Sequence, residues 1–184
     1  MDEKEAIRQL KRGDVSALEV LVQLFQVRAV RAAYLIIGDA GLAREVVQES
    51  FLRANRSIRG FDEARPFEPW FLRSVVNASI KCVQSTRREL PLEDLHAERH
   101  FERLAAQIDS VESQVERSET ARDIGLALEK LSPRQRAVIV QRYYLEMSEA
   151  DMAEEAGTAP GTVKWLLNAA RRRLRGLLAE RSDR

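Results

Sequence analysis

Residues 148–173, SEADMAEEAGTAPGTVKWLLNAARRR, decide how this chain is interpreted. The stretch predicts two short helices joined by a tight turn, and the second helix runs into a cluster of arginines. Ala153, Gly157 and Val163 mark the corners: a small residue lets the helices touch, a glycine lets the chain turn sharply, and a β-branched residue seats the second helix on the first. This arrangement is typical of a helix-turn-helix, whose second helix enters the major groove of DNA.

The second helix divides into an apolar side and a polar side. The apolar stripe is expected to face a small core and consists of Val163, Leu166, Leu167 and Ala170. The N-terminal part of a recognition helix meets the base edges, so the predicted base contacts are Pro160, Gly161, Thr162, Lys164, Trp165 and Asn168. Lysine can donate to guanine, and asparagine can pair with adenine through two hydrogen bonds.

The arginines that follow, Arg171 and Arg172 first among them, suit phosphate contacts better than base contacts. Two alternatives stay open at this point. Arginines at a helix end also complement the helix macrodipole without any ligand. Trp165 could stack on a sugar or a thymine methyl group, or it could cover the edge of the core.

Charge divides the chain into three segments. The 184 residues are 45% hydrophobic and 32% charged with a net charge of +1, but residues 1–88 carry +4, residues 89–123 carry −6 and residues 124–184 carry +3. Basic segments suit a phosphate backbone, although each could simply be a solvated surface. Strand patterns are nearly absent. We therefore expect an all-α protein of two small helical domains, residues 1–88 and 113–184, joined by an acidic linker at residues 89–112.

Within these domains, apolar spacing and punctuation predict individual helices. Asp39 opens one helix, Ser132 caps another before Pro133, and Ser148 with Asp151 resembles a capping box. The predicted helices are 17–36, 39–56, 67–88, 133–144, one beginning at 148, and 162 to about 178. Loops are expected at 57–66 and 158–161.

Several kinds of protein are excluded by what the chain contains. Cys82 is the only cysteine, so neither an internal disulfide nor a cysteine-rich metal site is possible. We expect Cys82 to be a small buried apolar residue and not a redox sensor. His96 and His100 have helical spacing but lie in the acidic segment, where surface positions are more common than metal ligands. The first residues lack an apolar signal core, and no apolar run approaches the about 20 residues of a bilayer span. We expect a cytoplasmic, non-enzymatic protein without cofactor, metal or membrane insertion.

Aromatic and basic residues gather around the loop at 57–66. Phe61, Phe67, Trp70 and Phe71 stand near Arg56, Arg59, Arg65 and Arg73. Aromatic rings beside arginines suit single-stranded nucleic acid, because bases stack on the rings and phosphates pair with the arginines. The alternative is that the aromatics are core residues, which we expect for Phe67 and Phe71. The helix before the loop has a polar side with Glu45, Gln48, Glu49 and Arg53, which taken alone is an ordinary solvated surface.

Taken together, the pieces resemble the sigma-70 family, specifically the compact extracytoplasmic-function group of bacterial sigma factors. The resemblance covers nearly all of the chain except the linker. It rests on Arg12-Gly13-Asp14, GDAGLAREVVQESFLRA at 38–54, RPFEPWFLRSVVNASI at 65–80 and the stretch 128–175. Departures occur at Arg44, Val76, Lys81, Leu166 and Ala169, which leave the promoter sequence open.

The resemblance implies a role for each segment. Glu45, Gln48, Glu49 and Arg53 would contact core RNA polymerase. The −10 promoter element would be melted and held by Arg56, Arg59, Phe61, Arg65, Trp70, Arg73, Asn77 and Lys81. The −35 element would be read as duplex by the residues of the helix-turn-helix named above, and an anti-sigma factor would be expected as regulator. An ordinary helix-turn-helix repressor explains residues 148–173 equally well, but it leaves the arginine-rich loop and the acidic linker unexplained.

Overall fold

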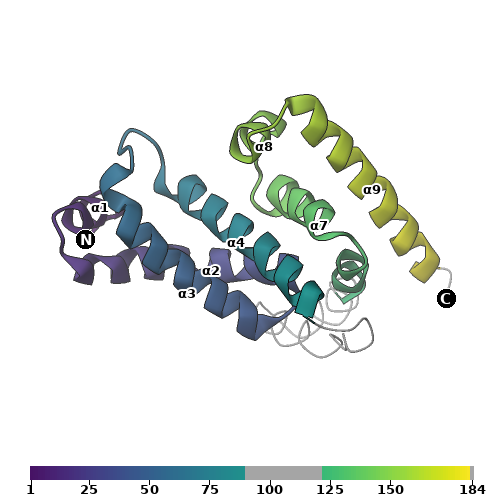
Figure 1. Cartoon of the computed structure of the whole chain (residues 1–184), viewed down its shortest axis with the longest axis horizontal. Helices are drawn as coiled ribbons and strands as arrows, with labels where there is room; N and C mark the ends of the chain where they lie inside the picture. The colour runs from purple at the N-terminus through teal and green to yellow at the C-terminus, as the bar shows by residue number, and fades with distance from the viewer. Residues whose placement is uncertain (90–121, 183–184) are drawn as a thin grey trace, which may run out of the picture.

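The computed structural model describes residues 1–89 and 122–182, and these ranges are helical and free of strands. The elements follow one another as α1 Glu3–Lys11, η1 Val15–Ala17, α2 Leu18–Ile37, α3 Ala40–Ser57, η2 Ile58–Gly60, α4 Phe67–Glu89, α7 Pro133–Ile139, η3 Val140–Tyr144, α8 Glu149–Ala156 and α9 Pro160–Ser182 (Figure 1). We call residues 1–89 the N-terminal module and residues 122–182 the C-terminal module. Nearly all of the predicted linker, with His96 and His100, lies outside the described residues.

The predicted helix starts are confirmed by their caps. The Asp39 carboxylate accepts a hydrogen bond from the backbone N–H of Leu42 at 2.8 Å, and Ser132 and Ser148 each form a complete capping box. These side chains satisfy backbone N–H groups that have no partner inside the helix. Gly38 and Gly157 end α2 and α8 with φ angles of 86° and 58°, in the left-handed region that glycine adopts without strain.

Two predicted boundaries are wrong. Helix α9 begins at Pro160 and not at Thr162, because proline fits the first turn of a helix, where its missing N–H is not needed. The turn of the helix-turn-helix is therefore shorter than 158–161. The predicted helix 133–144 also changes character at Val140, where a π-helical turn begins and the N–H of Leu145 bonds the carbonyl of Val140 at 3.0 Å.

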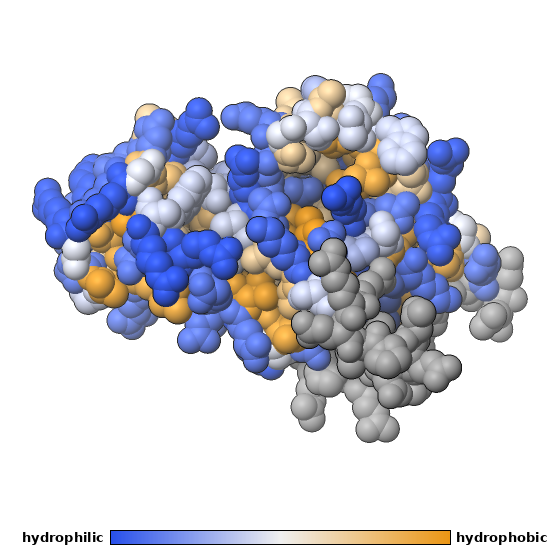
Figure 2. Space-filling model, in the orientation of Figure 1, coloured by the Kyte–Doolittle hydropathy of each residue, from blue (hydrophilic) through white to orange (hydrophobic). Residues whose placement is uncertain are grey.

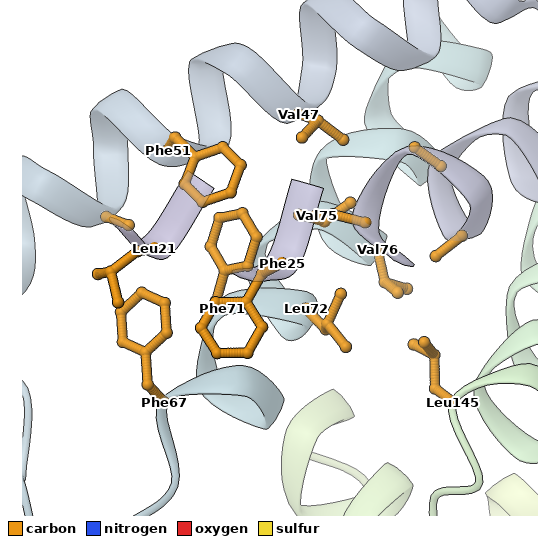
Figure 3. Packing of buried hydrophobic residues seen from close by; sticks show 14 of the residues in the cluster. Leu21, Phe25, Val47, Phe51, Phe67, Phe71, Leu72, Val75, Val76 and Leu145 are labelled. Atoms are coloured by element: carbon orange, nitrogen blue, oxygen red, sulfur yellow. The ribbon is translucent and has the colours of Figure 1, made fainter. Parts of the chain in front are cut away.

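An aromatic core holds the N-terminal module together. Phe51 from α3 and Phe71 from α4 stack with ring centroids 4.2 Å apart, and Phe67 stacks on Phe71 at 5.8 Å. Leu21 and Phe25 of α2 close the cluster from a third side (Figure 3). Phe67 and Phe71 are fully buried, as the sequence predicted. Outside this core the visible face of the molecule is mainly hydrophilic, with hydrophobic patches interrupting it (Figure 2).

Helix α2 corrects the expectation that no apolar run reaches membrane-spanning length. Val15–Ile37 is long and apolar enough to cross a bilayer by length and composition alone, with a mean hydropathy of 1.6. A core helix meets the same criterion. In the structure α2 packs against α1, α3, α4 and α7, which accounts for its buried apolar residues, whereas Leu24 and Val27 are exposed.

The two modules pack against each other, a question that the sequence left open. Helix α7 contacts both α2 and α4, and Ala137, Val140 and Leu145 join the core cluster of the N-terminal module. Figure 3 shows Leu145 pointing towards that cluster from the C-terminal side. The C-terminal module keeps a smaller aliphatic core made by Leu128, Leu131, Val138, Ile139, Met152, Ala153, Val163, Leu167 and Ala170.

Candidate nucleic-acid interface

Helix α9 presents the polar side that the sequence predicted. Val163, Leu167 and Ala170 are buried and Leu166 is half-buried, so the apolar stripe faces the core as expected. The predicted contacts that remain exposed are Pro160, Gly161, Thr162, Lys164, Trp165, Asn168 and Arg172. Trp165 is 67% exposed and therefore does not cover the edge of the core. An exposed indole on a recognition helix leaves its ring free for a sugar or base contact.

Arg171 differs from its neighbours because other side chains hold it. Its Nε donates to the hydroxyl of Tyr143 at 2.7 Å, and its guanidinium lies 5.6 Å from the centre of the Tyr143 ring. Its Nη1 also lies 3.4 Å from Oδ1 of Asn168. Sequence reasoning missed Tyr143, since the position was assigned to an ordinary helix.

The second candidate surface follows α4. Arg73, Asn77 and Lys81 are exposed and repeat every four residues, so they share one side of the helix. Arg73 is already engaged: its Nη2 donates to the backbone carbonyl of Glu155 in α8 at 2.6 Å. One predicted −10 residue thus bonds the C-terminal module in this arrangement.

The loop before α4 contains one clear correction. Phe61 is only 5% exposed, and its ring packs against Phe67 at 5.6 Å and Trp70 at 5.0 Å. It is a core residue in this structure and offers no face to an unpaired base. Lys11 fixes this part of the loop by donating to the carbonyl of Phe61 at 2.7 Å. Trp70 is half-buried in the same aromatic cluster.

The loop arginines keep their charges at the surface. Arg56, Arg59 and Arg65 are exposed; Arg56 lies 3.7 Å from Glu49, and Arg65 lies 3.8 Å from Asp62. Exposed pairs of this kind contribute little stability, so a phosphate can displace the carboxylate at low cost.

Glu155 is a buried carboxylate where the modules meet. It is 8% exposed, and burial raises its pKa to about 7, although the nearby Arg73 and a hydrogen bond from Gln141 both act to lower the pKa. Arg136 makes the other deep contact: its Nη1 donates to the carbonyl of Ile36 at 2.6 Å and its Nη2 to that of Glu129 at 2.8 Å. Sequence reasoning identified neither residue, because both roles depend on contacts between distant segments.

The third surface lies along α3. Glu45, Gln48, Glu49 and Arg53 are all exposed, and Glu49 lies 3.8 Å from Arg53. Leu52, an apolar residue of the same helix, is 41% exposed. An apolar side chain surrounded by charged ones is a common centre of a protein-protein interface.

None of these surfaces resembles a metal centre. Among residues 1–89 and 122–182, no group of three or more His, Cys, Asp or Glu side chains is placed to hold a metal ion. Cys82 is half-buried on α4.

Comparison with known proteins gives these surfaces a context. Residues 21–89 match Sigma-70 region 2, and residues 121–174 match Sigma-70 region 4. The chain is 36% identical over 161 residues to the ECF RNA polymerase sigma factor SigL of Mycobacterium tuberculosis, with 82% of each chain covered. The chain belongs to the ECF group of sigma-70 factors. It is also 29% identical to SigW of Bacillus subtilis, covering 96% of this chain and 97% of SigW.

Solved sigma factors share the fold. The sigma factor RpoE of Bartonella quintana matches with a TM-score of 0.67 at 23% identity, covering 90% of this chain and 98% of that one. CnrH matches with a TM-score of 0.64 at 22% identity, covering 97% of both chains. The helices of this sigma factor are therefore arranged as in its structural relatives.

Proposed function

We propose that this sigma factor uses its three exposed surfaces for three successive tasks. The α3 surface, with Glu45, Gln48, Glu49 and Arg53, binds core RNA polymerase. The α4 surface and the loop arginines hold the melted −10 element. The polar side of α9 reads the −35 element as duplex DNA. The protein itself catalyses no covalent step, and it works in the cytoplasm, where the polymerase is.

One observation carries the proposal: the two segments that match Sigma-70 regions 2 and 4 are the two that expose polar surfaces suited to these tasks. On α4, Arg73, Asn77 and Lys81 form a line that can follow a phosphate backbone. On α9, Lys164 and Asn168 provide the donors and the acceptor that base edges in the major groove require.

We also propose an anti-sigma factor as the regulator of this protein. RpoE of Bartonella quintana was solved in complex with the anti-sigma factor NepR, and CnrH with the cytosolic domain of CnrY. The exposed Leu52 offers a regulator an apolar contact on the same α3 surface that we assign to the polymerase.

The test is transcription by purified core polymerase on a genomic promoter library, with and without this protein. We expect new start sites that depend on it. Glu49→Lys should weaken binding to core polymerase roughly tenfold. The new lysine would be a third cation beside Arg53 and Arg56, and it would repel a polymerase surface that is complementary to the Glu49 carboxylate. Glu19→Lys makes the same charge change at an exposed site on α2 and should bind as the wild type does.

Two results would contradict the proposal. Equal binding of Glu49→Lys and the wild type to core polymerase would remove α3 from the interface. Tight, specific binding of the protein alone to duplex DNA, with no change in start sites, would instead indicate a repressor.

A further inference from the structure

Two adjacent tyrosines at the end of η3 point in opposite directions. Tyr144 is half-buried and packs against the core cluster of the N-terminal module, whereas Tyr143 is 60% exposed and contacts α9. The π-helical turn that includes both residues inserts one residue relative to an α-helix, which changes the direction of the side chains that follow. The tight packing of Tyr144 and Leu145 on one side therefore fixes Tyr143 on the other.

Tyr143 holds Arg171 in two ways. Its hydroxyl accepts a hydrogen bond from Nε of Arg171 at 2.7 Å, and its ring faces the guanidinium 5.6 Å away. Arg171 in turn lies 3.4 Å from Oδ1 of Asn168 through Nη1. The three side chains form a connected row that runs from η3 onto the polar side of α9.

The charge of Arg171 stays available in this row. Among residues 1–89 and 122–182, no carboxylate lies within ion-pair distance of its guanidinium, whose Nε donates to a hydroxyl group. A guanidinium has five N–H donors. With Nε on the tyrosine and Nη1 beside Asn168, the N–H groups of Nη2 remain for an acceptor on DNA.

Fixing a long side chain before binding reduces the conformational entropy that complex formation loses. An unrestrained arginine samples many rotamers, and an asparagine can rotate its amide away from a base. Arg171, Asn168 and Tyr143 all belong to the C-terminal module, so the row itself does not cross the junction between the modules.

We propose that Tyr143 is a positioning residue for promoter recognition: it holds Arg171, and through Arg171 it orients Asn168, for contact with the −35 duplex. This inference rests on the proposed function of α9. Tyr143 acts through Arg171 and does not itself need to touch DNA.

The experiment uses the complete holoenzyme and a promoter duplex that the wild-type holoenzyme selects from a random library. Affinity is measured for that duplex and for variants with each −35 base pair changed. Tyr143→Phe should lower affinity roughly threefold and Tyr143→Ala roughly tenfold, because the first removes the hydrogen bond and the second also removes the ring beneath the cation. The loss should be confined to one or two neighbouring base pairs.

Two controls separate positioning from folding. Tyr144→Phe removes the same atom from the adjacent residue, which faces the N-terminal module, and should leave base discrimination unchanged. On an Arg171→Ala background, Tyr143→Phe should have no further effect, because the residue through which it acts is gone.

The outcomes are distinguishable. If the wild-type holoenzyme selects no −35 sequence, the proposed function of α9 is wrong. If it does, and Tyr143→Phe discriminates as the wild type does, the positioning role is wrong. A full Tyr143→Phe effect in the absence of the Arg171 side chain would also overturn it, since Tyr143 would then contact DNA directly.

Discussion

The N-terminal and C-terminal modules are stabilised by different kinds of core. The first is built on large aromatic rings from three helices, with Phe67 and Phe71 fully buried. The second contains only aliphatic and small residues in its buried cluster, and one side of α7 contributes to the other module's core. The C-terminal module therefore depends on docking for part of its buried surface, whereas the N-terminal module closes its core largely with its own helices.

Helix α7 is where this difference is concentrated. The consecutive apolar residues at the end of α7 and the start of η3 divide between two clusters: Ala137 and Val140 face the N-terminal module, and Val138 and Ile139 face the C-terminal one. Arg136 on the same helix is 3% exposed and bonds carbonyl groups of both modules. Two small domains joined by a linker are thus tied together by one helix.

The largest effect is expected at Arg136. Arg136→Ala should lower the free energy of unfolding by about 3 kcal/mol, since it removes two charge-assisted hydrogen bonds and leaves the buried carbonyl of Ile36 without that donor. Urea unfolding followed by circular dichroism measures the loss. Solution scattering of the folded variant should show a larger radius of gyration as the modules separate.

Arg134→Ala provides the matched control, because Arg134 is exposed on the same helix. It should change stability by less than about 0.5 kcal/mol. If both variants unfold at the same urea concentration and have the same radius, the contact does not tie the modules together.

The next effect concerns Glu155 and pH. Its pKa is raised to about 7 from 4.5, so the folded protein keeps the proton over a range in which the unfolded chain has lost it. The stabilisation is fully present below pH 4.5 and is lost as the pH rises through about 7. Across this pH range the free energy of unfolding falls by at most about 3 kcal/mol. Glu155→Gln should remove this slope from a plot of unfolding free energy against pH.

Glu154→Gln changes the exposed neighbouring carboxylate and should keep the wild-type slope. If Glu155→Gln shows the same pH dependence as the wild type, another group controls the stability of the junction. The comparison is informative because the two residues are adjacent on α8 but differ in burial.

The sequence predicted the helices well because their signals are local. Ser132, Ser148 and Gly157 act through backbone groups within a few residues, and those positions are recognisable without any knowledge of the fold. The apolar stripe of α9 was predicted for the same reason. The candidate surfaces on α3 and α9 followed from the same periodicity, together with the resemblance to a family.

What the sequence could not predict depends on contacts between distant segments. Phe61 was assigned to the −10 surface, but its burial depends on α4 packing over the loop. Leu52 is apolar, yet neighbouring helices leave its position uncovered. The division of α7 between two clusters is invisible in a pattern that shows only that its residues are apolar. The domain boundaries and the roles of individual site residues stay predictions.

The smallest expected effect lies at Glu146, between η3 and α8. It is the only non-glycine residue with a positive φ among the described residues, at 58°, whereas Gly13 and Gly38 supply such angles in the N-terminal module. A side chain with a Cβ is strained in this region, and glycine is not. Glu146→Gly should raise the free energy of unfolding by about 0.5–1 kcal/mol, because relief of strain exceeds the extra entropy of the unfolded chain.

Glu146→Ala removes the same charge but keeps the Cβ, so it should leave stability unchanged in the same urea titration. If alanine stabilises the protein as much as glycine does, charge and not backbone strain limits the C-terminal module at this turn.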